Sequence, residues 1–455
     1  MAYVPITDAQ STSLLDQLKI DSVASLFSEI SSQKKATPMN IENGLSDIDL
    51  LKEMRAFAAK NKTVKSYISF MGGGSYEHFI PSTVPHILGR SEFYTAYTPY
   101  QPELSQGSLK GIFEFQTMVS ELFGLEIANA SVYDGASALA EACVMAMQET
   151  GRTSFLIPLN LPLNYIQVLK SYLIPKGATL VEFPINNDLS LDLAQFESQV
   201  SDKFAAVVLP YPDRFGTIYN FRSITQRAEQ LGVFKIFSAD PIAMGVLESP
   251  GKLGADIAVG EGQALGLPVN YGGPYIGLLA AKRSLIRSMP GRVVGQTIDT
   301  DGSVGYCLTF QTREQHIRRE KSLSNICSNQ ALMALANTVY LSTMGPTGLQ
   351  HVAKLCIRNT NALKAHLKSI AGVSVLNTHP TFKEFVVRLP VAAEQFCKKM
   401  QLHGFLAGIP LSQIGLADTH LLLVSATEMR NLDEISRYSK AAEQVLSHEK
   451  VLAHE

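Results

Sequence analysis

The sequence predicts an α/β fold in which helices cover both faces of a mainly parallel β-sheet. Five short apolar runs follow one another through the middle of the chain: TSFLIP, ATLVEF, AAVVLP, FKIFSA and ADIAVG. They are apolar throughout instead of alternating with polar residues, which is typical of strands buried on both faces of a parallel sheet. Between them, LNYIQVLKSYLIPKG and SITQRAEQLG have the apolar spacing of crossover helices.

The residues before these strands predict helices and one short strand. From about Phe113, FEFQTMVSELFG is predicted to be helical, ANASVY to be a short strand and ASALAEACVMAMQE to be a helix. The first 60 residues are predicted to be mostly helical, with Thr7 and Ser46 as N-caps ahead of STSLLDQL and DIDLLKEMRAFAAKN. Between these two helices, the polar segment SSQKKATPMNIENG is interpreted as a linker or surface loop.

The C-terminal part of the chain predicts a smaller α+β domain. A long helix, NQALMALANTVYLSTMG, begins after Ser328 and is expected to end at Gly345 and Pro346. The strands SVLNT, FKEFVVRLP and HLLLVSAT follow, with helices before and after them. We therefore predict an N-terminal helical extension (1–65), a large domain (66–330) and a small C-terminal domain (331–455).

Composition and charge exclude several classes of function. The chain has 455 residues, of which 46% are hydrophobic, and a net charge of −2, with no basic stripe that would bind nucleic acid. The five cysteines are widely spaced and form no CxxC, so neither a disulfide framework nor a metal site is expected. The start, MAYVPITDAQ, is unlike a signal peptide, and no apolar run reaches the ~18 residues that span a membrane. We expect a cytoplasmic protein.

Two candidate ligand-binding groups lie at the carboxyl ends of predicted strands, where open α/β sheets bind ligands. The turn Asp134, Gly135, Ala136 and Ser137 leads from a strand into a helix, and free N–H groups at a helix N-terminus bind phosphate well. An ordinary capped turn is the competing interpretation. Asp240 closes the strand FKIFSAD and could hold a proton on a pyridine nitrogen, although a capped strand end also fits.

The third candidate group surrounds Gln263. The segment from Ser238 to Gly277 looks like the cofactor-bearing centre of a pyridoxal-phosphate enzyme, except that Gln263 stands where lysine is expected. An aldehyde cofactor is held through an imine, which needs a free amine, whereas the nitrogen of glutamine is delocalised into its carbonyl. Lys252, in a Pro/Gly turn nearby, is expected to be a solvated loop residue. The chain is therefore not expected to do this covalent chemistry alone.

Six motifs in succession carry a family resemblance: GGGSYEHFIPS, YTAYTPYQPELSQG, NASVYDGASALAEACVMA, SADPIAMG, GLPVNYGGPYIG and RVVGQTIDTDGSVGYCLTFQTREQHIRREKSLSNICSNQALMALA. The chain resembles the amino-terminal subunit of the glycine decarboxylase P-protein family over essentially its whole length. The block QTREQHIRREK is the most specific motif. The resemblance implies a fold-type-I pyridoxal-phosphate transferase fold, with a mainly parallel sheet of the seven-stranded type.

The same resemblance implies a division of labour between two homologous subunits. The second subunit carries the Schiff-base lysine, opposite Gln263, and so binds the pyridoxal phosphate, which implies no catalytic residue in this chain. The implied reaction decarboxylates glycine and transfers the aminomethyl group to the lipoyl arm of H-protein. The implied partners are thus the second subunit, lipoylated H-protein and glycine, and the number of subunit pairs stays open.

Loops of this chain could complete the partner's site. An aromatic segment could offer phenolic hydroxyls, and a glycine turn could bring N–H groups to a phosphate. A histidine and an arginine are further candidates, the arginine as an anchor for a carboxylate or for an acidic H-protein. Buried or interface aromatics and a solvated ion-pair network are the competing interpretations. The candidates are Tyr94, Tyr97, Tyr100, Asn270, Tyr271, Gly272, His78 and Arg313.

Three alternatives deserve comparison. The retained residues Asp240 and Asp134 to Ser137 could form a vestigial pocket that still binds pyridoxal phosphate noncovalently, for which we expect weak or no occupancy. A purely structural or regulatory subunit fits the missing lysine equally well. A nicotinamide site fits poorly, because Gly260, Gly262 and Gly266 have the spacing GxGxxxG, and turn residues then replace the helix that a dinucleotide needs.

Overall fold

The computed structural model describes residues 6–30, 40–42, 44–270 and 272–452, with side chains up to residue 447. The chain forms two compact units, Met1–Lys62 and Thr63–Glu455. Most of the predicted linker SSQKKATPMNIENG, and the candidate Tyr271, lie outside the described residues. The boundaries at 66, 330 and 331 stay a prediction.

The first unit contains the helices α1 (Asp8–Leu18) and α2 (Asp47–Ala58) and the 3₁₀ turn η1 (Val23–Phe27). Thr7 caps α1 in a reciprocal capping box with Gln10. Ser46 caps α2 by accepting a hydrogen bond from the N–H of Asp49. Both predicted N-caps are therefore confirmed. None of the residues described in this unit is buried.

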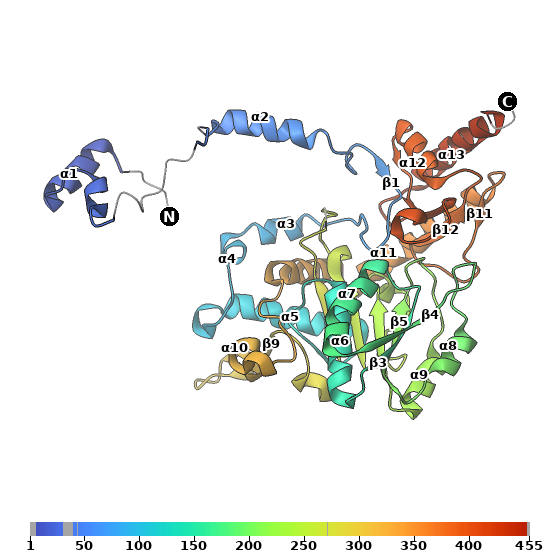
Figure 1. The fold of residues 1–455 in the computed structure, drawn as a ribbon, viewed down its shortest axis with the longest axis horizontal. Coiled ribbons are helices and arrows are strands. Elements are labelled where there is room, and N and C mark those ends of the chain that lie inside the picture. The colour runs from blue at the N-terminus through green and yellow to red at the C-terminus, as the bar shows by residue number, and fades with distance from the viewer. Residues whose placement is uncertain (1–5, 31–39, 43, 271, 453–455) are drawn as a thin grey trace. The chain divides into compact units, whose positions relative to one another are not determined.

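The second unit is built on a seven-stranded sheet with the order β2-β8-β7-β6-β5-β3-β4 (Figure 1). Strands β3 to β7 are parallel, and β8 runs antiparallel to both of its neighbours. All five apolar runs form strands as predicted. The strands are β2 (Ile127–Ala128), β3 (Ser154–Pro158), β4 (Thr179–Phe183), β5 (Phe204–Tyr211), β6 (Phe234–Ala239), β7 (Ile257–Glu261) and β8 (Gly277–Ala281).

One predicted strand is shorter than expected. Within ANASVY, the strand β2 ends at Ala128, and Val132 makes only an isolated bridge to Gly277. The physical reason is local hydrogen bonding, because the side chain of Asn129 accepts the N–H of Ser131, which has a φ of 97°. This N–H therefore cannot continue the ladder with β8.

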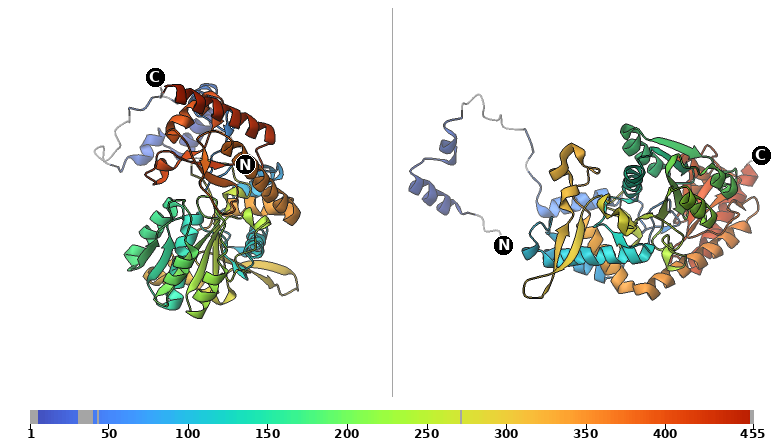
Figure 2. Two further views of the ribbon diagram at one scale, coloured as in Figure 1. Left: turned by 90° about the vertical axis from the view of Figure 1, so that its right-hand side faces the viewer. Right: turned by 90° about the horizontal axis from the view of Figure 1, so that it is seen from below.

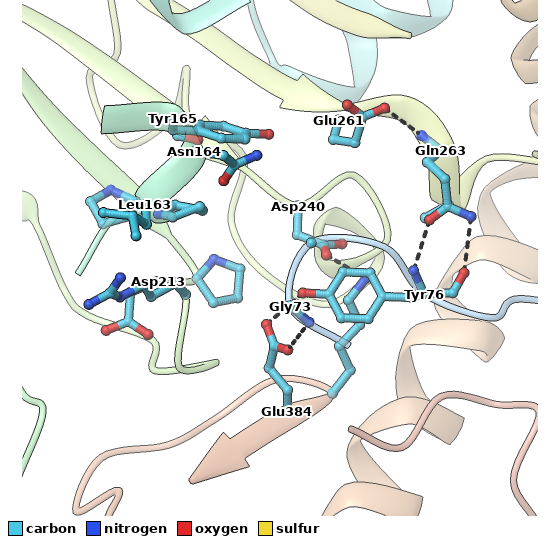
Figure 3. Close-up of a pocket in the computed structure, with 18 of the residues that line it drawn as sticks. Gly73, Tyr76, Leu163, Asn164, Tyr165, Asp213, Asp240, Glu261, Gln263 and Glu384 are labelled. Carbon is cyan, nitrogen blue, oxygen red and sulfur yellow. Dashed lines mark hydrogen bonds and ion pairs between the residues drawn. The ribbon is translucent and has the colours of Figure 1, made fainter. Parts of the chain in front are cut away.

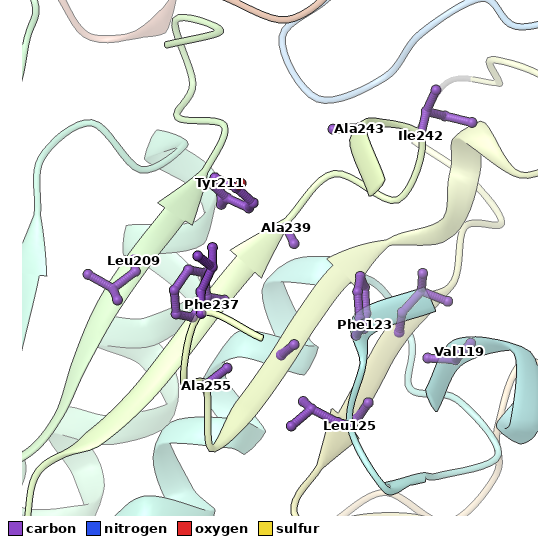
Figure 4. Packing of buried hydrophobic residues seen from close by; sticks show 14 of the residues in the cluster. Val119, Phe123, Leu125, Leu209, Tyr211, Phe237, Ala239, Ile242, Ala243 and Ala255 are labelled. Carbon is purple, nitrogen blue, oxygen red and sulfur yellow. The ribbon is translucent and has the colours of Figure 1, made fainter. Parts of the chain in front are cut away.

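Helices cover both faces of the sheet. In β5, Val207 and Leu209 belong to one hydrophobic core, while Ala206 and Val208 belong to the core on the other face. The first core includes residues of α5, α9 and α11 as far as Cys356, and the second includes residues of α6 and α7. Figure 4 shows Phe123 of α5 beside the sheet near Ala239. Burial on both faces explains the apolar runs of β3, β5, β6 and β7. The strand β4 differs from the prediction, because it lies at the edge of the sheet and Thr179 and Glu182 are exposed.

The remaining elements complete this unit. An antiparallel hairpin, β9 (Val293–Ile298) and β10 (Val304–Thr309), lies outside the main sheet. The α-helices described in this unit are α3 (Thr83–Leu88), α4 (Ser91–Tyr94), α5 (Gln106–Phe123), α6 (Gly135–Thr150), α7 (Leu163–Leu173), α8 (Leu193–Gln199), α9 (Arg222–Gln230), α10 (Gln315–Arg318), α11 (Ala331–Lys368), α12 (Ala393–Leu402) and α13 (Leu432–Leu452). None of the described helices is long and apolar enough to cross a membrane.

A smaller sheet packs with its own core at the C-terminal end (Figure 2). Its four antiparallel strands have the order β11-β12-β15-β14 and pack against α12, α13 and the second half of α11. A separate parallel pair joins β1 to β13, so residues from the predicted large domain pair with the C-terminal part. The strands are β1 (Ile68–Ser69), β11 (Ser374–Val375), β12 (Glu384–Arg388), β13 (Phe405–Leu406), β14 (Ile409–Pro410) and β15 (Leu421–Ser425).

The long helix α11 differs from the prediction at its middle. The expected end at Gly345 is a kink, where the backbone has φ 60° and ψ −179°, and the chain resumes helical geometry with Pro346 in the first turn. Proline fits the first turn of a helix because its missing N–H would have no partner there. The sequence signal for a helix end was therefore right locally, but a second helix follows at once.

Candidate functional site

A cavity of about 370 Å³ lies at the carboxyl ends of β5, β6 and β7. Its lining comes from five parts of the chain: these strand ends with the residues that follow them, the start of α7, the segment 73–76, the segment 382–384 that leads into β12, and residues 413–414 (Figure 3). Two of the predicted candidates, Asp240 and Gln263, line this cavity. This is the edge of the sheet at which open α/β proteins bind ligands.

Gln263 lies in the short turn η6 (Gly262–Ala264) directly after β7 and is 1% exposed. Its amide oxygen accepts the N–H of Tyr76 at 2.9 Å, and its amide nitrogen donates to the carbonyls of Tyr76 at 3.0 Å and Leu267 at 2.8 Å. Both ends of the amide are thus used to hold the segment 73–76 against the sheet. The side chain supplies no nucleophile to the cavity.

Asp240 follows β6 and already has partners on both carboxylate oxygens. One oxygen accepts the N–H groups of Ile242 at 2.9 Å and Ala243 at 3.1 Å. The other lies 2.5 Å from the ammonium nitrogen of Lys383, whose side chain is 2% exposed. The same ammonium lies 3.6 Å from the centre of the Tyr76 ring.

Lys383 also connects Asp240 to a second carboxylate through a histidine. The ammonium lies 3.4 Å from Nε2 of His78, and Nδ1 of that ring lies 2.7 Å from the carboxylate of Glu428. Burial raises the pKa of Glu428, but the charge and hydrogen bond of His78 outweigh it, so the pKa is lowered overall. His78 is buried inside this chain. Its contribution to a partner's site stays a prediction.

Glu384, next to Lys383 in the sequence, holds the glycine turn of GGGSYEHF. Its carboxylate accepts the hydroxyl of Tyr76 at 2.5 Å and the N–H of Gly73 at 3.0 Å. A Cβ at Gly72 would lie 2.7 Å from this carboxylate, so the turn needs glycine there. Burial raises the pKa of Glu384 to about 7.

The N-terminus of α6 is the turn predicted as a phosphate site. Asp134 caps it by accepting the N–H of Ser137 at 2.7 Å and its hydroxyl at 2.8 Å, as the competing interpretation had it. Glu261 at the end of β7 accepts the N–H of Gly135 at 2.9 Å. A Cβ at Gly135 would lie 2.1 Å from the hydroxyl oxygen of Tyr165, so a side chain already fills the space above this turn.

Glu261 is itself held like a bound anion. Besides Gly135, its carboxylate accepts the N–H groups of Gln263 at 3.1 Å and Ile276 at 3.2 Å. Burial raises the pKa of Glu261 to about 7, although these backbone donors act in the opposite direction. The carboxyl is therefore mainly ionised above neutral pH.

A pyridoxal phosphate molecule does not fit the residues of this cavity. Gln263, at the position predicted for the imine-forming lysine, is an amide with both its oxygen and its nitrogen hydrogen-bonded. The carboxylate that would face the ring nitrogen is paired with Lys383. The N–H groups that would hold the phosphate are taken by Glu261 and Asp134. No reaction step is therefore assigned to a cofactor in this chain.

The predicted tyrosine loop lies elsewhere. Its three tyrosines, Tyr94, Tyr97 and Tyr100, are exposed by 67%, 83% and 51%, and none of them lines the cavity. The hydroxyl of Tyr100 accepts a hydrogen bond from Arg292 at 3.1 Å, and this guanidinium also donates to Thr98. Arg292 thus fixes the base of a loop whose aromatic side chains stay accessible.

Two further candidates lie on the surface turn after η6. Asn270 and Gly272 are exposed, and Gly272 has a φ of 93°, which favours glycine. Arg313, by contrast, is used inside the chain, because it donates to the carbonyls of Met289, Gly291 and Phe310. Burial lowers the pKa of Arg313. These contacts brace the backbone, and a contribution of Arg313 to the partner's site stays a prediction.

Three ligand-type side chains also lie close together near the cavity. His78, Cys356 and Glu428 have their ligand atoms within 4.8 Å of one another. Both ring nitrogens of His78 already have neighbours, and one of these is the ammonium of Lys383. A buried positive charge beside the ring disfavours a metal cation at this place.

The glycines of the GxGxxxG pattern have packing roles. A Cβ at Gly260 would lie 2.5 Å from the carbonyl oxygen of Ala239, and one at Gly262 would lie 2.5 Å from the side-chain oxygen of Asn337. Gly266 has a φ of 97°. These glycines permit close contacts and a turn, which explains them without a dinucleotide.

The sequence did not point to three side chains that line the cavity and set its charge and shape: Lys383, Glu261 and Tyr165. Glu261 directly follows the apolar run ADIAVG and Lys383 lies at the start of FKEFVVRLP, so each is a charge beside an apolar run, which is a weak signal of a buried charge. Their pairing with Asp240 and α6 depends on the tertiary structure. Tyr165 lies in an ordinary amphipathic helix and had no signal.

Comparisons with known proteins agree over nearly the whole chain. A family model described as "Glycine cleavage system P-protein" matches residues 1–440. The chain is 45% identical over 436 residues to a probable glycine dehydrogenase (decarboxylating) subunit 1 of Desulforamulus reducens, covering 96% of this chain and 98% of the relative.

Solved structures give the same result. A crystal structure of glycine decarboxylase (P-protein) of the glycine cleavage system, in inhibitor-bound form, matches with a TM-score of 0.89 and 38% identity, covering 98% of this chain and 100% of that chain. A sphingosine-1-phosphate lyase of Burkholderia pseudomallei matches with a TM-score of 0.66 at 16% identity, covering 92% and 94%, and shows the shared fold alone. The predicted fold-type-I class is thereby confirmed.

Proposed function

Because this chain belongs to the family of glycine cleavage system P-proteins, we propose that it is subunit 1 of a glycine dehydrogenase (decarboxylating) and works with a homologous second subunit that carries pyridoxal phosphate. The proposed assembly releases the carboxyl group of glycine as CO₂ and transfers the aminomethyl group to the lipoyl arm of H-protein. This chain supports and completes the partner's site. A cytoplasmic location is part of the proposal.

One observation carries the proposal. The family resemblance places Gln263 opposite the Schiff-base lysine of the second subunit, and the structure ties its amide by three hydrogen bonds to Tyr76 and Leu267. An amide cannot form an imine with an aldehyde cofactor. A member of this family that keeps the whole fold but lacks the amine therefore needs a second chain for the chemistry.

The first test compares the chain alone with the assembly. The purified chain, supplied with glycine, pyridoxal phosphate and lipoylated H-protein, should release no CO₂ above background. Adding the lysine-bearing subunit should restore release and should form a complex by size-exclusion chromatography. CO₂ release by the chain alone at the rate of the assembly would contradict the proposal.

The second test separates a site-completing role from a purely structural or regulatory one. Tyr97 is 83% exposed, so its side chain is available to a partner. Tyr97→Ala in the assembled enzyme should lower kcat by at least about tenfold, which corresponds to about 1.4 kcal/mol of barrier. Leu402→Ala, at an 87% exposed position in α12, is the matched control and should leave kcat unchanged.

The two outcomes of this second test assign the role of the chain. If Tyr97→Ala assembles normally and keeps full activity, the loop takes no part in the partner's chemistry. The purely structural or regulatory reading then replaces the site-completing one. If assembly itself is lost, Tyr97→Phe reports on the hydroxyl, because the ring remains available for packing.

A further inference from the structure

A pyridoxal phosphate molecule has two charged ends, and this chain retains a binding position for each. The phosphate is a dianion, which the N-terminus of a helix such as α6 could hold. The protonated ring nitrogen is a cation, which Asp240 could face. Both positions belong to the rim of the same cavity, because Glu261, which contacts α6, and Asp240 both line it.

A lysine of this chain occupies the ring-nitrogen end. The ammonium of Lys383 lies 2.5 Å from the carboxylate of Asp240 and 3.6 Å from the centre of the Tyr76 ring. Since the side chain is 2% exposed, it cannot move into solvent without opening the structure. A pyridinium ion would have to displace this ammonium and leave a buried cation without its counter-charge, which is unfavourable.

A glutamate of this chain occupies the phosphate end. The carboxylate of Glu261 accepts the N–H of Gly135, the first residue of α6. The hydroxyl of Tyr165 fills the space above that residue, as the 2.1 Å approach to a Cβ at Gly135 indicates. An incoming phosphate would meet a carboxylate of the same sign instead of free N–H groups.

We propose that Lys383 and Glu261 are built-in substitutes for the two charged ends of the cofactor, so that the pocket excludes pyridoxal phosphate independently of Gln263. Each substitute has the same sign as the charge that it replaces. The missing lysine explains why no imine forms, whereas the substitutes explain why the phosphate and ring contacts are lost as well. The inference rests on the fold of the family and not on the proposed partnership, since its test uses this chain alone.

The test first places a lysine at position 263 and then removes the two charged side chains that occupy the ring-nitrogen and phosphate positions. Gln263→Lys alone should bind pyridoxal phosphate no more than threefold tighter than the unmodified chain. The triple change Gln263→Lys, Lys383→Met and Glu261→Ala should bind it at least tenfold tighter than Gln263→Lys alone. Binding is measured by fluorescence titration and by borohydride reduction followed by mass spectrometry, above pH 8, where Glu261 with its pKa of about 7 is ionised.

A matched control tests whether any loss of a buried lysine would have the same effect. Lys235 is 2% exposed and pairs with Asp256 at the opposite end of β6. Lys235→Met on the Gln263→Lys background should leave cofactor binding unchanged. Lys383→Arg on the same background keeps the positive charge and should also leave the cofactor excluded.

A comparison of pyridoxal phosphate with pyridoxal, which lacks the phosphate, separates the effect of Glu261 from that of Lys383. Because it uses single changes, this comparison also tests the proposal if the triple variant does not fold. On the Gln263→Lys background, Glu261→Ala should raise the preference for pyridoxal phosphate over pyridoxal at least tenfold. Lys383→Met should instead improve the binding of both compounds alike. The proposal is overturned if Gln263→Lys alone binds the cofactor as tightly as the triple variant, or if neither single change alters binding.

Discussion

At the residue scale, the cavity is defined by side chains whose partners come from distant parts of the same chain. Gln263 binds the backbone of Tyr76, and Lys383 neutralises Asp240. Glu384 accepts hydrogen bonds from Tyr76 and Gly73. These partnerships satisfy buried polar groups that would otherwise destabilise the fold. These side chains therefore hold the walls of the cavity together.

A buried glutamate outside the cavity gives a prediction about pH. Glu141 of α6 is buried, and this burial raises its pKa from the ordinary 4.5 to about 7. Between these values the folded chain holds a proton that the unfolded chain has lost, so this group lowers stability as the pH rises through that window. Glu141→Gln removes the effect. We expect the variant to be more stable than the unmodified chain by about 2–3 kcal/mol at pH 8, and the difference to shrink toward pH 5.

Urea unfolding of the isolated chain at three pH values measures this difference. Glu149→Gln is the matched control, because Glu149 lies in the same helix but is exposed. It should change the free energy of unfolding by less than about 0.5 kcal/mol at every pH. A stability difference for Glu141→Gln that does not depend on pH would show that the ionisation of Glu141 is not responsible.

At the element scale, short turns position the site more than the strands themselves do. The turn η6 presents Gln263 directly after β7, and the glycine turn at 72–74 closes over Glu384. The helix α11 kinks at Gly345, packs in the core of the large sheet as far as Cys356, and packs in the core of the small sheet from Leu363 on. Each of these turns depends on a glycine with little or no tolerance for a side chain.

The kink gives a second prediction. Gly345 has φ 60° and ψ −179°, a conformation that residues with a Cβ adopt only with strain. A Cβ there would meet no other atom within 4 Å, so the penalty of Gly345→Ala is conformational and not steric. We expect a loss of about 1–3 kcal/mol in the free energy of unfolding, measured by urea denaturation.

Gly107→Ala is the control for this prediction. Gly107 lies in α5, also has open space around its Cβ position, and is not among the residues with positive φ. Alanine has the higher helix propensity, so this change should be neutral or stabilising by up to about 1 kcal/mol. Equal effects of the two substitutions would refute the strain at Gly345.

At the scale of the whole molecule, every hydrophobic core among the described residues lies in the second unit. Two of them cover the faces of the large sheet and a third underlies the small sheet. The first unit, in contrast, has no buried residue among those described. Apolar burial provides most of the stability of a folded chain, so the second unit should carry nearly all of it.

A pair of truncations tests this distribution. Removal of residues 1–62 should change the midpoint of thermal unfolding by less than about 3 °C, because little buried surface is lost. Removal of the residues after Asn431 deletes α13, whose Ile435 and Tyr438 are fully buried, and should prevent cooperative unfolding. Circular dichroism during heating measures both. If the chain without residues 1–62 has an unfolding midpoint more than 10 °C below that of the full chain, the first unit stabilises the second.

Much of the architecture followed from local patterns. The apolar runs of β3, β5, β6 and β7 predicted strands buried on both faces, whereas β4 lies at the sheet edge and is partly exposed. The N-caps Thr7 and Ser46 were predictable from hydrogen-bonding side chains ahead of helical repeats. The pattern failed in ANASVY and at Gly345. In ANASVY, the side chain of Asn129 accepts the N–H of Ser131, which then cannot bond to β8. At Gly345, helical geometry resumes directly after the residue that was predicted to end the helix.

The sequence by itself determined the family, the fold class and the inability of Gln263 to form an imine, because these depend on residue identity and local order. Only the tertiary structure decided what the retained pocket contains. Asp240 follows β6 of the large sheet, whereas Lys383 precedes β12 of the small sheet, and Glu261 meets α6 only after the sheet has formed. An ion pair forms only where two charged groups lie close together in space, and the local order of residues does not predict that distance.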